Sequence, residues 1–222
     1  MAINKKQSSI WVKAVLVFVA LAFIVSLLPQ VFLGNKNGAK GEASASGAGA
    51  VLESIANEHL PAVTSYTSAL ASEPTSYTAL VGLGNTYFDW GAKLQEARQA
   101  LGDVDGHDLP MWLAAAAAYD RALTIKPGDP SVGTDMAISL YYAAQTDRAI
   151  EVIEGVRADA PDFGPAYFNA GVFYRGVGEN AKAIAAFERY LELEPEGASA
   201  PPARSMLSEL QGASTGETTG TP

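Results

Sequence analysis

Apolar residues follow two different patterns along the chain. No residue from Ala14 to Gly34 carries a charge, and the stretch Val12–Leu28 is almost wholly apolar. Beyond residue 50 the chain is rich in Ala, Leu, Glu and Arg, and Pro and Gly interrupt it at intervals. These patterns predict one long apolar segment followed by an all-α domain of amphipathic helices.

The apolar segment predicts a membrane anchor, because a helix needs roughly 20 apolar residues to cross a bilayer and residues 10–34 supply them. Trp11 stands at one edge, where an indole suits the lipid headgroups, and Lys13 can extend its ammonium group to water there. The alternative is a signal peptide cleaved near Ala43-Ser44-Ala45. The apolar core of a signal peptide is normally about 7–15 residues, so the longer run favours an uncleaved, single-pass helix.

Lysines flank the predicted apolar helix unequally. Three lie on its amino-terminal side, two of them in the short basic flank 1–9, and two lie on the other side. The positive-inside rule then predicts a cytoplasmic amino terminus and a domain outside the cell membrane. Residues 35–50, rich in Gly, Ala, Ser and Lys, predict a flexible linker. Residues 212–222 are mainly Gly, Thr and Ser with almost no apolar side chain, and they predict a disordered tail.

A period of 34 residues organises the rest. Pro127, Pro161 and Pro195 lie 34 residues apart. Two other positions share their frame: an alanine twelve residues before each proline and a large apolar residue eight before it, which are Ala115, Ala149 and Ala183, and Tyr119, Ile153 and Phe187. A small residue allows two antiparallel helices to approach, and a proline ends the second helix. The period therefore predicts stacked helical hairpins.

These positions carry a resemblance to the tetratricopeptide repeat (TPR) family. They are Leu83-Gly84-x-x-Tyr87, Tyr167-x-x-Ala170-Gly171-x-x-Tyr174 and Ala183-x-x-x-Phe187 ending at Pro195. The resemblance implies a TPR solenoid over residues 51–211. Its expected parts are a partial repeat at 51–73, a repeat with a 19-residue insertion at 74–127, regular repeats at 128–161 and 162–195, and a capping helix at 199–211. Leu94, Ala97 and Leu101 indicate that part of the insertion lengthens the first helix.

Charge and cysteine content narrow the possible functions. The formal net charge is -9, but five of the 15 basic residues and none of the 24 acidic ones precede residue 41. The remainder has 10 basic against 24 acidic residues, a net charge of -14, which disfavours nucleic-acid binding. The absence of cysteine excludes disulfides and thiolate chemistry.

No residue pattern predicts catalysis, a cofactor or a metal site. His59 precedes Leu60-Pro61 and is expected at the surface at a helix boundary. His107 lies in the acidic stretch Asp103–Asp108, whose register does not fit a calcium loop and which we interpret as capping the helix that begins near Pro110. The repeats leave no room for a catalytic domain, so we expect no enzyme.

The resemblance implies that the first helix of each repeat lines a concave, peptide-binding surface. The residues expected there are Val81, Asn85, Phe88, Asp135, Ser139, Tyr142, Phe168, Asn169, Val172 and Arg175. Arg175 is the single cation of this set and would bind a carboxylate. Chaperone-binding TPR domains grip a terminal carboxylate with several basic residues together with asparagines. Because Val81 and Asp135 replace basic residues here, that specificity is not carried over.

The sequence thus predicts a membrane-tethered scaffold that binds a peptide segment of a partner protein and assists assembly of a membrane or envelope complex. The alternative is a structural organiser that self-associates at the membrane.

Overall fold

The computed structural model describes residues 42–101 and 107–216, and the side chains of 47–101 and 107–212. The chain divides into two compact units, residues 1–53 and residues 54–222. The described part of the first unit, residues 42–53, is the beginning of helix α2 (Glu42–Ser72), and the later helices belong to the second unit.

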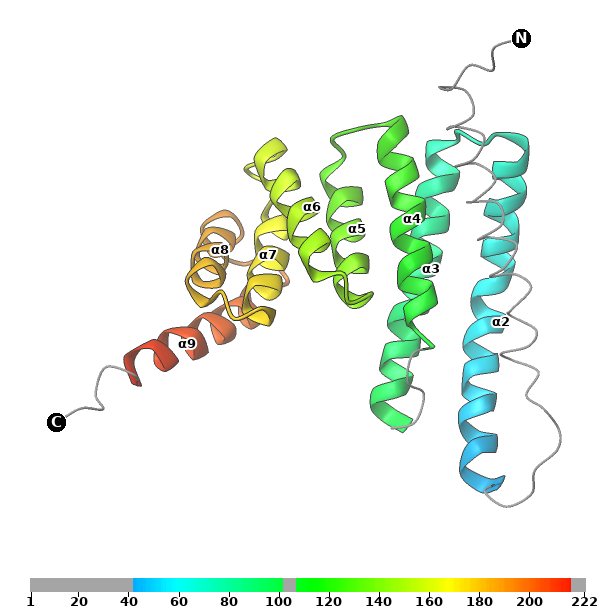
Figure 1. The fold of residues 1–222 in the computed structure, drawn as a ribbon, viewed down its shortest axis with the longest axis horizontal. Coiled ribbons are helices and arrows are strands. Elements are labelled where there is room, and N and C mark those ends of the chain that lie inside the picture. Colours follow the sequence, from blue (N-terminus) through cyan, green and yellow to red (C-terminus); the bar gives the residue numbers. More distant parts are fainter. Residues whose placement is uncertain (1–41, 102–106, 217–222) are drawn as a thin grey trace, which may run out of the picture. The chain divides into compact units, whose positions relative to one another are not determined.

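The described residues are all-α, as the sequence predicted. They form eight helices: α2 (Glu42–Ser72), α3 (Tyr77–Leu101), α4 (Leu109–Ile125), α5 (Pro130–Tyr142), α6 (Thr146–Asp159), α7 (Gly164–Gly176), α8 (Asn180–Leu193) and α9 (Ala200–Gly216). From α3 onward each helix packs against the next along the chain, and α5 also contacts both α3 and α7. Figure 1 shows α3 and α4, α5 and α6, and α7 and α8 as successive hairpins in the order of the sequence.

Small residues hold the two helices of a hairpin together. A Cβ atom at Gly84 of α3 would lie 2.5 Å from a ring atom of Tyr119 in α4, and one at Gly171 of α7 would lie 2.6 Å from a ring atom of Phe187 in α8. Both rings are almost fully buried. Glycine at these positions therefore creates the space that an aromatic ring fills.

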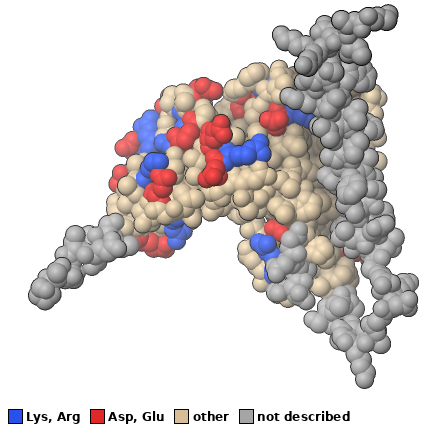
Figure 2. All heavy atoms as spheres, viewed as in Figure 1, with Lys and Arg blue, Asp and Glu red and all other residues tan. Residues whose placement is uncertain are grey.

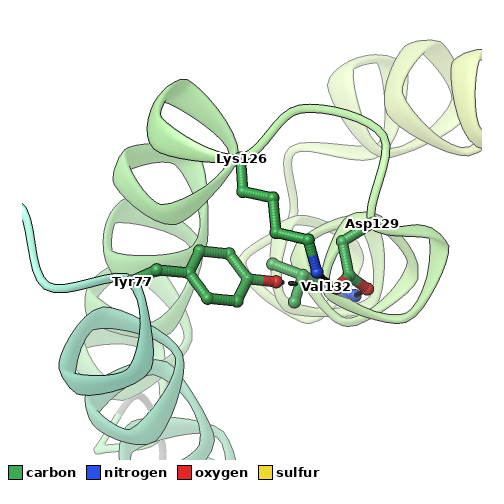
Figure 3. Close-up of polar contacts among 4 residues, drawn as sticks. All are labelled: Tyr77, Lys126, Asp129 and Val132. Carbon is green, nitrogen blue, oxygen red and sulfur yellow. Dashed lines mark hydrogen bonds and ion pairs between the residues drawn. The ribbon is translucent and has the colours of Figure 1, made fainter.

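The junction between the first two hairpins is a short polar turn. Gly128 adopts a left-handed φ of +79°, which glycine takes without strain. Asp129 then caps α5, because its carboxylate accepts a hydrogen bond from the backbone N–H of Val132 at 3.4 Å. Lys126 Nζ lies 3.2 Å from the same carboxylate (Figure 3). The turn thus fixes where α5 starts.

His59 is not at the surface or at a helix boundary, and this prediction was wrong. Helix α2 continues through Pro61, and His59 is only 6% exposed. Its ring stacks on Trp90 of α3 with centroids 5.6 Å apart, and its Nδ1 lies 2.8 Å from the carbonyl oxygen of Ile55. The prolyl ring is exposed on the opposite side, so packing on Trp90 outweighs the local tendency of proline to end the helix.

The insertion lengthens the first hairpin. Helix α3 has 25 residues, whereas its counterparts α5 and α7 have 13 each. Leu94 and Ala97 are buried in this extension, as their spacing predicted. Asp108 precedes α4 but makes no side-chain capping bond. Its buried carboxylate instead accepts from the Trp112 indole and from Arg98, both at 3.4 Å.

The predicted anchor at 10–34 and most of the predicted linker lie outside the described residues, but α2 begins at Glu42, within the range expected for the linker. The capping helix expected at 199–211 corresponds to α9, which runs to Gly216. Among the helices that the structure describes, none combines the length and apolar character needed to cross a membrane.

Candidate functional site

The predicted binding residues lie on the first helices of the three hairpins. We call the surface made by α3, α5 and α7 the first-helix face, and define it by Asn85, Phe88, Asp89, Asp135, Ile138, Tyr141, Tyr142, Val172 and Arg175. The repeat frame aligns Gly84 with Ala137 and Gly171. Equivalent positions therefore form rows across the helices, and Asp89 and Tyr142 belong to one such row.

Aromatic rings connect the hairpins along this face. Phe88 of α3 packs edge-on against Trp112 of α4, with centroids 5.2 Å apart, and Trp112 stacks on Tyr142 of α5 at 4.8 Å. Tyr141 packs edge-on against Tyr142 at 5.8 Å and stacks on Phe173 of α7 at 4.6 Å. Trp112 and Phe173 are buried, whereas Tyr142 is 43% exposed. The exposed ring of Tyr142 is thus held in place by the buried ring of Trp112.

A polar cluster lies beside these rings. The Tyr119 hydroxyl donates a hydrogen bond to Oδ1 of Asn85 at 2.9 Å. Asp89 is one helical turn beyond Asn85 on α3, and Asp135 belongs to the neighbouring α5. Burial raises the pKa of Tyr119, and the negative charges of Asp135 and Asp89 raise it further. Both carboxylates therefore lie within electrostatic reach of the same hydroxyl.

Asp135 itself titrates in an unusual range. Burial, followed by the nearby charges of Asp129 and Asp89, raises the pKa of Asp135 to about 6. Among residues 54–101 and 107–212, no lysine, arginine or histidine forms an ion pair with Asp89 or Asp135. The two charges are thus left without a cation.

Ser139 does not line an open surface. It is fully buried, and its hydroxyl donates to the backbone carbonyl of Asp135 at 2.7 Å. The repeat frame gives the reason, since Ser139 is equivalent to Phe173, which faces the core. The α5 counterparts of Asn85 and Phe88 are Ile138 and Tyr141.

Four other predicted residues are half-buried, and two of them are engaged in contacts within the unit. Phe168 packs against Phe187 and Tyr190 of α8, with centroids 5.9 and 5.4 Å apart. The Asn169 side-chain amide donates to the carbonyl of Pro165 at 2.8 Å. The other two, Val81 and Val172, are half-buried on α3 and α7.

Arg175, expected to anchor a carboxylate, is already paired with one. Its guanidinium donates to Glu209 of α9 at 2.9 Å. Both side chains remain partly exposed, so a ligand carboxylate would have to compete with the protein's own helix. Most other described cations are also paired, and Figure 2 shows basic side chains beside acidic ones over α6, α7 and α8.

A cleft of about 220 Å³ lies elsewhere in the unit. Its wall includes Pro127, Gly128 and Asp129 at the start of α5, with Val152 and Val156 of α6. None of the predicted binding residues lines it. Among the side chains described, no group of three or more His, Cys, Asp or Glu residues could hold a metal ion, while part of the acidic stretch at 103–108 lies outside the description.

Sequence reasoning missed Asp89, Trp112, Tyr119 and Glu209. Two of them have a sequence signal. Glu209 lies 34 residues after Arg175, so extending the repeat frame into the cap would have placed both in one row. Asp89 shares a row with Tyr142 once the 19-residue insertion is counted.

Comparisons with known proteins agree with the helical-repeat fold. Residues 134–201 match a family model described as tetratricopeptide repeat. No curated protein matches the sequence. Among solved structures, the first TPR of Spaghetti (RPAP3), bound to the HSP90 peptide SRMEEVD, has a TM-score of 0.50 and 20% identity over 63% of this chain and 93% of that chain.

Two further structures show the same fold. MamA has a TM-score of 0.50 and 16% identity, covering 71% of this chain and 90% of its own. A tetratricopeptide repeat protein from Parabacteroides merdae has a TM-score of 0.52 and 19% identity, covering 73% of this chain and 61% of its own. The family model matches residues 134–201 only, and the structures show the same fold, so the predicted all-α helical repeat is confirmed.

Proposed function

We propose that this tetratricopeptide repeat unit holds a peptide segment of another protein against its first-helix face. The observation that carries the proposal is the exposed ring of Tyr142, which stacks at 4.8 Å on the buried Trp112. A ring held rigidly at the surface offers contact area without losing side-chain freedom when a ligand binds. Asn85, one turn before Asp89 on α3, adds an exposed amide to the same face.

The fold supports the same function. Stacked helical repeats present extended surfaces that suit peptides, and a structurally similar domain, the first TPR of Spaghetti, is bound to an HSP90 peptide. TPR domains are typically interaction scaffolds rather than enzymes. Fold similarity at 20% identity does not transfer the ligand of that protein to this chain.

We further propose that residues 10–34 anchor the chain in a cell membrane with the repeat unit outside the cytoplasm. The support is the uncharged run from Ala14 to Gly34 and the excess of lysine before it. A tether confines the repeat unit and a membrane partner to the same surface, which raises their effective concentration and compensates for modest affinity. This arrangement suits the assembly of a membrane or envelope complex.

The proposal is tested with full-length protein cross-linked in intact membranes and then purified for mass spectrometry. Wild type is compared with the triple variant Asn85→Ala, Tyr142→Ala, Arg175→Ala, once circular dichroism shows that both are folded. The face variant should lose partners that the wild type retains.

A second triple variant serves as the matched control: Thr124→Ala, Glu151→Ala, Glu188→Ala changes exposed positions on the second helices α4, α6 and α8. It should keep the wild-type partners. If the face variant keeps the same partners at the same yield as this control, the first-helix face is not the binding surface.

A further inference from the structure

Two carboxylates on the first-helix face have no counter-charge. Asp89 is exposed and Asp135 is half-buried, and neither forms an ion pair with a described cation. About half of the other described acidic groups of the unit do form an ion pair, for example Glu154 with Arg157 and Glu179 with Lys182. The negative potential on this face is therefore not neutralised by the protein itself.

The two carboxylates lie on the same helices as the aromatic residues Phe88 and Tyr142. Asp89 follows Phe88, whose ring packs edge-on against Trp112. Asp135 is seven residues before Tyr142 on α5, which places both on one side of that helix. Helix α3 thus carries one carboxylate of this face, and the adjacent helix α5 carries the other together with the exposed ring of Tyr142.

A carboxylate ligand is poorly matched to this surface. The Asn85 amide oxygen is engaged by the Tyr119 hydroxyl, and Arg175 is held by Glu209 of α9. A ligand with carboxylates would meet Asp89 and Asp135 with no free cation beside them, and like charges brought together cost binding free energy.

We infer that the occupant of the first-helix face is a basic segment of another protein, in which lysine or arginine side chains lie against Asp89 and Asp135 and a neighbouring apolar side chain packs on Tyr142. This inference rests on the proposed function and adds the chemistry of the partner. Charge complementarity supports it: the repeat unit has two carboxylates without an ion pair on the same face as the exposed ring of Tyr142.

The test uses full-length protein in detergent and three fluorescent peptides of equal length. The first alternates lysine with leucine and phenylalanine, the second replaces each lysine with glutamate, and the third is extended from SRMEEVD. Fluorescence anisotropy is measured at low and at physiological salt. The lysine peptide should bind at least tenfold more tightly than either acidic peptide, and its affinity should fall as salt rises.

Two double variants locate the binding. Asp89→Asn, Asp135→Asn removes the two charges of the face, and Asp147→Asn, Glu151→Gln removes two exposed charges from α6, one turn apart. The first should weaken the lysine peptide about tenfold, and the matched control should weaken it less than about twofold. Tyr142→Ala should also weaken it while leaving the salt dependence unchanged.

The outcomes separate this inference from the proposal on which it rests. The inference is overturned if the lysine peptide binds no more tightly than the glutamate peptide, including the case in which neither binds, or if both double variants weaken it equally. If an acidic peptide binds instead and loses affinity with Tyr142→Ala, the face is still a peptide site and only the partner's chemistry is wrong. If the triple variant Asn85→Ala, Tyr142→Ala, Arg175→Ala also retains the partners that wild type binds in membranes, both this inference and the proposed function are wrong.

Discussion

The hydroxyl group of Tyr77, at the start of α3, donates a hydrogen bond of 2.7 Å to the carboxylate of Asp129, 52 residues later (Figure 3). The same carboxylate caps α5 and accepts from Lys126, whose ammonium group lies 5.0 Å from the centre of the Tyr77 ring. One carboxylate therefore links the first helix of one hairpin to the first helix of the next. Burial raises the pKa of Tyr77 to about 12, and the hydrogen bond to Asp129 adds to this rise.

Tyr77→Phe should lower the free energy of unfolding by about 1 kcal/mol, the net value of one hydrogen bond, because the ring remains in place while its donor is lost. Urea denaturation followed by circular dichroism measures this. Tyr66→Phe is a suitable control, since the Tyr66 hydroxyl has no hydrogen bond to any residue that the structure describes. Equal effects of the two substitutions would show that the bond does not stabilise the junction.

Stability should depend on pH through Asp135. Its pKa in the folded protein, about 6, is above its ordinary value of 3.8, so the folded state binds the proton more tightly than the unfolded state. Protonation below pH 6 then stabilises the fold, and this contribution is lost as pH rises from about 4 to 6. Asp135→Asn should remove this dependence. The unfolding free energy of the variant, relative to that of wild type, should therefore increase by about 2 kcal/mol from pH 4 to pH 7.

Asp129 also makes stability depend on pH, and its contribution has to be distinguished from that of Asp135. The pKa of Asp129 is lowered, chiefly by its hydrogen bond from Tyr77, so its contribution changes with pH in the opposite direction. Because wild type and Asp135→Asn share Asp129, its effect cancels in their difference. A difference in unfolding free energy that is constant from pH 4 to pH 7 would contradict the assignment to Asp135.

Replacing two different glycines with alanine should change the stability of the fold in opposite directions. Gly171→Ala should destabilise the fold by about 1–2 kcal/mol, because its methyl group would overlap the buried ring of Phe187. Gly155, inside α6, has no atom within 4 Å of an added Cβ. Gly155→Ala should therefore stabilise it by about 0.5–1 kcal/mol through helix propensity alone. Thermal unfolding of both variants measures the contrast, and two shifts of the same sign would disprove it.

The repeat period identified the hairpins because the signals involved are local. A proline ends a helix through its own missing N–H group, and a small residue such as Gly84 marks the place where a ring such as Tyr119 will pack. Such positions recur whenever the unit recurs, so spacing alone reveals them. Which residues lie on the first-helix face depends on rotation about each helix axis, and one residue corresponds to 100°. That is why Ser139, one position from Ile138, proved to be buried.

Contacts that cross the period were not predictable in this way. His59 packs on Trp90, a residue that no neighbouring sequence signal connects with it, and this packing overrides the boundary that Leu60-Pro61 indicated. Asp89 and Asp135 come together only because α3 and α5 are adjacent in space. Charge pairing between distant helices follows from the stacking, whereas the sequence alone shows only that the domain is acidic.

The apolar segment at 10–34 should remain in the mature protein. Its uncharged run is longer than a signal peptide requires, so intact protein should stay with membranes through washes with salt and alkali. Amino-terminal mapping of the purified protein checks this, and a mature terminus near Ala45 would contradict it. Protease added to intact cells should remove the repeat unit; full protection until lysis would place it in the cytoplasm instead.

The ion pair between Arg175 and Glu209 provides the last prediction. It joins α7 to the capping helix α9 at a partly exposed site, where screening by water keeps the contribution of an ion pair below about 1 kcal/mol. Glu209→Gln should therefore change the unfolding free energy by less than that amount, in urea denaturation of the full chain. Its larger effect should be on ligand choice, because it frees the guanidinium group of Arg175. An acidic peptide such as SRMEEVD should bind this variant more tightly than wild type, and Arg175→Ala in the same background should abolish the gain. The lysine peptide should bind both proteins alike, since its contacts are with Asp89 and Asp135. If Glu209→Gln leaves the affinity for the acidic peptide unchanged, then Glu209 does not keep Arg175 from ligands.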